Sequence, residues 1–138
     1  GSTEAKVDPE LASFVEDFLA DARAFGVGEG HWHEVSSVGF ADLGDLSLAG
    51  MCYTKSRKVE IASVHWPYQG PCVRRALLYH ELGHCVLDLE HSEVKEDLMF
   101  HQLPDEASCV REFEAARRRF FEGVKFQAGP LVLPGERP

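Results

Sequence analysis

The chain has 138 residues and a formal net charge of −9, from 23 acidic and 14 basic residues; its 44% hydrophobic content excludes a largely disordered chain. The acidic balance argues against nucleic acid as a partner, because phosphate binding needs clustered lysine and arginine, and it weakly favours basic peptides as ligands. No run of about 18 apolar residues occurs, so the sequence predicts no membrane span.

The first predicted element is an amphipathic helix. Asp8-Pro9 is typical of a helix start, since proline is well tolerated at the first helical position. Apolar residues then recur at three- and four-residue spacing as far as Phe25, and Gly26 ends the pattern. We interpret this helix as a cover for the hydrophobic core.

A strand-rich stretch follows the helix. Residues 35–40 and 46–54 are apolar runs, and residues 59–64 alternate between two faces. The polar residues 55–58 join the last two runs, which predicts a β-hairpin. We expect residues 59–66 to form the edge of the sheet beside a cleft, where an extended substrate would add by backbone hydrogen bonding.

Two further helices are predicted after a break at Pro67, Gly70 and Pro71. The first runs over residues 72–87. The second has apolar residues at helical spacing as far as Val124, with Asp105 or Ser108 as its cap.

The sequence therefore predicts an α+β fold: a small mixed twisted sheet with an N-terminal helix, a helix that carries a His-Glu-x-x-His motif, and a C-terminal helix. We expect a single domain over residues 1–138, in which residues 1–8 and 129–138 are flexible tails.

The motif is His80-Glu81-Leu82-Gly83-His84. Residues four apart lie on one face of a helix, so both imidazoles can bind the same metal ion. Glu81 follows the first histidine and can reach a water on the metal without binding the metal itself. Zinc lowers the pKa of such a water and a nearby carboxylate collects its proton, so we expect Zn²⁺ as cofactor and Glu81 as general base.

A catalytic zinc site needs a third protein ligand, and His91 is the first candidate. If the helix continued, His91 would lie about 10 Å beyond His84 along the axis. The helix must therefore end soon after His84, and Asp88 is the residue in that span most tolerant of a left-handed turn. Carboxylates that follow are alternatives as third ligand: Glu106 first, then Glu112 and Glu114.

At this point the chain resembles the metzincin clan of metallopeptidases, which carry H-E-x-x-H-x-x-G-x-x-H and then a methionine turn. The motif at residues 80–84 matches, His91-Ser92 is similar to the third ligand and the serine after it, and Leu98-Met99-Phe100 is similar to the methionine turn. The resemblance implies a zinc endopeptidase that acts on peptides or proteins, with His80, His84 and His91 as metal ligands.

The chain departs from the clan at two points. Six residues separate His84 from His91 where the clan has five, and Leu87 replaces the clan's glycine. A longer loop without glycine resembles small bacterial metzincin-like proteins with a HELGHC core, which also carry a Gly-x-Cys strand like Gly50-Met51-Cys52. This resemblance implies a disulfide between Cys52 and Cys85.

The cysteines form no C-x-x-C pair, and their even number fits disulfides in an oxidising compartment: Cys52, Cys72, Cys85 and Cys109. We expect a periplasmic or secreted monomer. Gly1-Ser2 resembles the remnant of an expression tag, so any signal peptide is expected to have been removed. Two other functions fit the same residues: a catalytically silent zinc-binding interaction module, and a zinc amidase acting on a non-protein amide.

Overall fold

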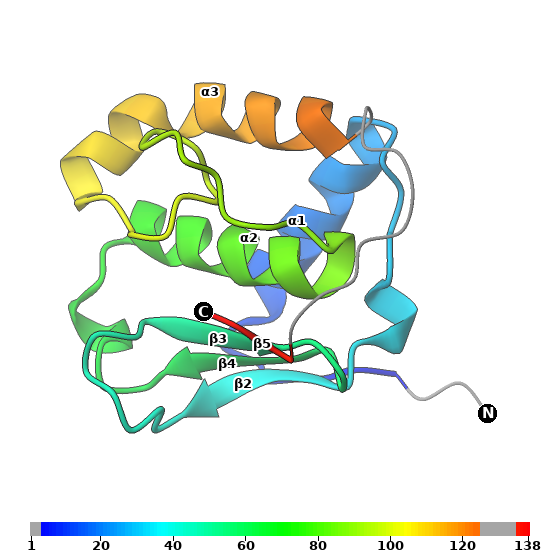
Figure 1. The fold of residues 1–138 in the computed structure, drawn as a ribbon, viewed down its shortest axis with the longest axis vertical. Helices are drawn as coiled ribbons and strands as arrows, with labels where there is room; N and C mark the ends of the chain where they lie inside the picture. Colours follow the sequence, from blue (N-terminus) through cyan, green and yellow to red (C-terminus); the bar gives the residue numbers. More distant parts are fainter. Residues whose placement is uncertain (1–3, 125–134) are drawn as a thin grey trace.

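The computed structural model describes residues 4–124 and 135–138, and these residues form an α+β fold as predicted (Figure 1). The helices in them are α1 (Ala12–Ala24), α2 (Pro71–Leu87) and α3 (Glu106–Val124). The strands are β1 (Lys6–Val7), β2 (Ser37–Ala41), β3 (Gly50–Tyr53), β4 (Lys58–Ala62) and β5 (Glu136–Arg137).

The sheet is mixed, with the strand order β1-β2-β4-β3-β5. Strand β2 runs parallel to β1 and β4, whereas β3 is antiparallel to both β4 and β5. The predicted hairpin is therefore β3–β4, although β3 begins only at Gly50. The prediction that residues 59–66 form the sheet edge is wrong, because β4 lies between β2 and β3.

Helix α2 forms the middle layer of the molecule. Figure 1 shows it between the sheet on one side and α3 on the other, with α1 behind it. Every residue from 76 to 87 is buried, and this span includes the complete His-Glu-x-x-His motif. A helix that is covered all round is held by packing on several faces, so the motif's backbone is fixed by the core.

The starts of α2 and α3 agree with the sequence signals. Helix α2 starts at Pro71, which suits the first helical position. Before α3, the Asp105 carboxylate accepts a hydrogen bond of 2.8 Å from the backbone N–H of Ser108, so Asp105 is the predicted cap. Of the two predicted tails, residues 1–3 and 129–134 lie outside the described residues; Lys6–Val7 and Glu136–Arg137 pair within the sheet.

Two disulfides tie α2 to its neighbours. Cys52–Cys85 joins α2 to β3, which confirms the pairing implied by the resemblance, and Cys72–Cys109 joins α2 to α3. Such bonds are typical of proteins from oxidising compartments. Among the described residues, no helix has the length and apolar character to cross a membrane.

Candidate metal centre

Three histidines from two segments of the chain converge. His80 and His84 come from α2, and His91 comes from the chain that follows it. Their ring centroids lie 4.9, 5.2 and 4.9 Å apart, and one ring nitrogen from each lies within 4.8 Å of the others. The three predicted ligands therefore lie together, at a spacing that one metal ion can bridge.

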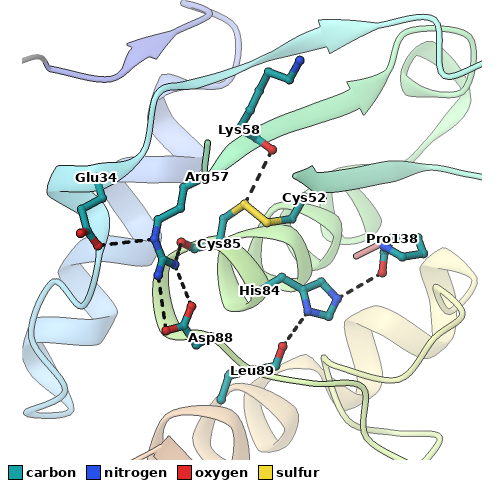
Figure 2. Close-up of a disulfide and its surroundings, with 9 residues drawn as sticks. All are labelled: Glu34, Cys52, Arg57, Lys58, His84, Cys85, Asp88, Leu89 and Pro138. Carbon is teal, nitrogen blue, oxygen red and sulfur yellow. Dashed lines mark hydrogen bonds and ion pairs between the residues drawn. A yellow bond between two sulfur atoms is a disulfide. The ribbon is translucent and has the colours of Figure 1, made fainter. Parts of the chain in front are cut away.

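A left-handed residue returns the chain to the centre. Asp88 has φ 57° and ψ 31°, and the N–H of Leu89 then bonds to the carbonyl of Gly83 at 3.0 Å. This confirms the prediction that Asp88 makes the turn. Arg57 supports it from the hairpin: its guanidinium donates to the Asp88 carboxylate and to the Cys85 carbonyl, each at 2.7 Å (Figure 2).

Backbone carbonyls orient two of the imidazoles. The Nδ1 of His80 lies 2.7 Å from the carbonyl oxygen of Leu98, and the Nδ1 of His84 lies 2.7 Å from that of Leu89. A carbonyl oxygen only accepts hydrogen bonds, so each Nδ1 must carry the hydrogen. Both Nε2 atoms then present lone pairs to the centre, which is the arrangement that metal-binding histidines use.

A fourth atom, an oxygen, faces the same point. The carbonyl oxygen of Pro138 lies 3.2, 3.1 and 2.8 Å from the Nε2 atoms of His80, His84 and His91. For the first two histidines this contact brings two acceptors together, since their hydrogens are on Nδ1.

Protonation of His80 or His84 at Nε2 would turn this contact into a hydrogen bond, but it is unfavourable at both residues. Burial lowers the pKa of His80, and burial together with the neighbouring His80 lowers the pKa of His84 to about 3. A metal cation held by the imidazoles satisfies their lone pairs without a proton, so the donor set fits a metal ion such as zinc.

Glu81 lies beside the histidines as a buried carboxylate. Its side chain is 1% exposed, burial raises its pKa well above the usual value, and Oε1 has no hydrogen-bond partner among the described residues. Gly50 makes room for it, because a Cβ there would lie 2.9 Å from Glu81 Oε2. A cavity of about 360 Å³ opens beside His80 and Glu81 and is bounded by residues 47–50. The carboxylate is therefore placed next to space for water or a ligand.

Met99 packs beneath the motif, as the resemblance to a methionine turn implies. A Cβ at Gly83 would lie 2.6 Å from the Met99 sulfur, so only glycine fits between the two motif histidines. The loop is closed by the N–H of Ser92, which bonds to the Met99 carbonyl at 2.9 Å. The thioether fills the space beside Gly83.

The carboxylates predicted as alternative third ligands lie elsewhere. Glu106 accepts hydrogen bonds from the backbone N–H groups of Cys72 and Val73 at 3.1 and 2.9 Å, so it caps the start of α2. That position is about 12 Å along the helix from His80. Glu112 and Glu114 pair with arginines of their own helix, Arg111 and Arg117.

Comparison with known proteins found no family model that matches this sequence. No curated protein and no solved structure matched it either. The interpretation of the centre therefore depends on the motif and on the geometry of this chain.

Sequence reasoning missed three contributors to the centre: the Arg57 guanidinium, the two carbonyls that orient the imidazoles, and residues 135–138. The carbonyls carry no side-chain signal, because any residue type supplies one. Residues 135–138 were predicted to be part of a tail, and a two-residue strand is too short to show periodicity.

Proposed function

We propose that this protein is a zinc-dependent endopeptidase of the metzincin type, in which His80, His84 and His91 hold the metal and Glu81 is the general base. The observation that carries the proposal is the convergence of three Nε2 atoms beside a buried carboxylate with a free oxygen, at the edge of an open cavity. Three protein ligands and an accessible fourth position are typical of catalytic zinc sites.

The chemistry divides between the metal and the chain. Zinc, when bound, supplies Lewis acidity that activates water and polarises a carbonyl group. Glu81 accepts the proton of the attacking water and later transfers it to the leaving amine. Oε1 is the atom suited to this role, because it has no other partner among the described residues. The carbonyls of Leu89 and Leu98 hold His84 and His80 in the tautomer that binds the metal.

A peptide is the substrate that best fits the surroundings of the site. Strand β3 borders the cavity and offers backbone groups to an extended chain, as its pairing with β5 illustrates. This favours a peptidase over an amidase that acts on a non-protein amide. The two disulfides support a periplasmic or secreted location, and we propose that the protein acts there as a monomer.

The experiment compares metal content and hydrolysis in the wild type and three variants. Glu81→Gln is expected to keep zinc and to lower kcat by a factor on the order of 10² to 10⁴ on an unstructured protein substrate. His91→Ala is expected to lose zinc, whereas Glu106→Ala keeps it and loses only stability through its capping role. Zinc retained in His91→Ala and lost in Glu106→Ala would contradict the ligand assignment.

A zinc-binding module without activity is the second candidate, and one observation favours it: β5 and the Pro138 carbonyl already fill part of the cleft. Under this alternative, the wild type and Glu81→Gln bind zinc equally and neither cleaves peptides. Hydrolysis by the wild type that Glu81→Gln abolishes decides for the endopeptidase.

A further inference from the structure

Residues 135–138 lie in the cleft as an extended peptide would. Arg137 is paired with Cys52 and Glu136 with Tyr53, antiparallel to β3, and the N–H of Thr54 bonds to the carbonyl of Gly135 at 2.9 Å. Figure 1 shows this segment, in red, next to β3 and below α2. At the end of the segment, the carbonyl oxygen of Pro138 faces the three histidines. The segment therefore has a defined direction and a defined register relative to the metal centre.

The register identifies which parts of the cleft receive which residues. If the carbonyl that faces the histidines marks the bond to be cleaved, Pro138 occupies the position just before that bond and Arg137 the position before it. The cavity beyond Pro138 continues along residues 47–50 and is available to the residues after the bond. The inference from this register rests on the proposed function.

Among the residues that the structure describes, the side chain of Arg137 has one acidic partner. Its guanidinium lies 3.2 Å from the Glu90 carboxylate, and the Arg137 side chain is only 13% exposed while that of Glu90 is 60% exposed. A cation so far removed from water needs a compensating charge. Glu90 immediately precedes His91, so the turn that places the third histidine also places this carboxylate at the cleft.

We propose that Glu90 and the β3 edge form a subsite for a basic side chain, located one residue before the residue whose carbonyl faces the histidines. The substrates are peptides with arginine or lysine at that position. Residues 135–138 fill the same subsite as an internal, substrate-like segment and so compete with peptides. One guanidinium nitrogen contacts Glu90 and Nε has no partner among the described residues, so lysine is accepted as well.

The first experiment measures binding without hydrolysis. Two fluorescent peptides, Gly-Glu-Arg-Pro-Ala-Ala and the same peptide with glutamate for arginine, are titrated by anisotropy into the full chain carrying Glu81→Gln and loaded with zinc. The arginine peptide is expected to bind more tightly by a factor of up to about five, the range of an exposed ion pair. Glu90→Gln removes the preference, whereas Glu93→Gln, an exposed glutamate of the same loop, preserves it.

The second experiment tests the internal segment. Arg137→Glu places two carboxylates together, so it is expected to release the segment and to tighten binding of the arginine peptide, whereas Arg137→Lys has no such effect. Combining Arg137→Glu with Glu90→Arg restores the pair with its charges exchanged and weakens peptide binding again. Equal binding of the two peptides to every variant, or no binding of either peptide to Arg137→Glu, overturns the proposal.

The outcomes separate this inference from the proposed function. A Glu90-dependent preference for arginine in a protein that cleaves no peptide leaves the subsite standing and removes the endopeptidase. Cleavage that depends on Glu81 but is equally fast for any residue opposite Glu90 supports the endopeptidase and removes the subsite.

Discussion

The backbone angle φ of one residue, Asp88, brings His91 next to His80 and His84. His91 lies seven positions after His84, and only the left-handed conformation of Asp88 turns the chain back towards the centre. Asp88 also accepts hydrogen bonds from Arg57, and both side chains are largely buried, at 18% and 17% exposure. This residue therefore has two roles, one through its backbone and one through its carboxylate.

Three substitutions at Asp88 separate the two roles. Asp88→Asn keeps a residue that tolerates positive φ and an oxygen that accepts from Arg57, so zinc affinity is expected to change little. Asp88→Gly keeps the turn but loses the contact with Arg57, which costs about 1–2 kcal/mol of stability while zinc still binds. Asp88→Val is strained at φ 57° by about 1–3 kcal/mol and is expected to weaken zinc binding as well.

Zinc affinity by competition with a chelating dye, and stability by urea unfolding, distinguish these variants. Arg57→Ala is the comparison variant, since it leaves residue 88 unchanged and removes the contact with its carboxylate, together with that to the Cys85 carbonyl. If Asp88→Val binds zinc as tightly as Asp88→Asn, the backbone angle does not control the third ligand.

The roles of residues in and just after the motif could be predicted because they depend on neighbours close in the sequence. The spacing of His80 and His84 indicates one helix face, and the low cost of positive φ for aspartate indicates Asp88. Arg57 lies 31 residues before Asp88 in the sequence. A single long-range contact of this kind leaves no periodic pattern, so only the structure could reveal it.

At the scale of elements, the sequence predicts where strands occur more reliably than it predicts which strands pair with one another in the sheet. Alternation of apolar and polar residues indicates that residues 59–64 are extended, but it says nothing about which strands pair on either side. The parallel pairing of β2 with β4 places β4 inside the sheet and leaves β3 to border the cleft. The order of the strands therefore determines which of them borders the cleft, and local alternation in the sequence does not reveal that order.

The two disulfides provide a matched pair for testing how elements position the centre. Their sequence separations, 33 and 37 residues, are nearly equal, so removing either is expected to cost a similar amount of stability, about 3–4 kcal/mol. Cys85 directly follows His84, whereas Cys72 lies at the distant end of α2. Replacing Cys52 and Cys85 with serine should therefore weaken zinc binding more than replacing Cys72 and Cys109.

Zinc affinity and urea unfolding of the two double variants are measured side by side under conditions where both remain folded. Equal loss of zinc affinity at equal loss of stability would mean that the Cys52–Cys85 bond acts on the whole fold and has no separate effect on the centre.

At the scale of the whole molecule, the aromatic part of the hydrophobic core and the candidate metal centre involve different residues of α2. Aromatic side chains of α1 and α3 pack edge to face or tilted around Tyr79 of α2: Phe18, Phe113, Phe120 and Phe121. The hydroxyl of Tyr79 donates to Asp21 at 2.5 Å, which satisfies the one polar group in this cluster. None of these contacts involves a proposed metal ligand.

Removal of the metal is therefore expected to lower the stability of the protein without unfolding it. At a zinc concentration about 1,000-fold above Kd, binding adds about 4 kcal/mol to the free energy of unfolding. For a domain of this size that corresponds to a decrease in Tm of roughly 10–15 °C when zinc is chelated. Far-UV circular dichroism at 25 °C should change little, because the core and both disulfides remain in place. His91→Ala should begin near the lower Tm and show no response to zinc. Loss of the helical signal on chelation would instead mean that the metal holds the fold together, as in zinc fingers, and that the centre is structural.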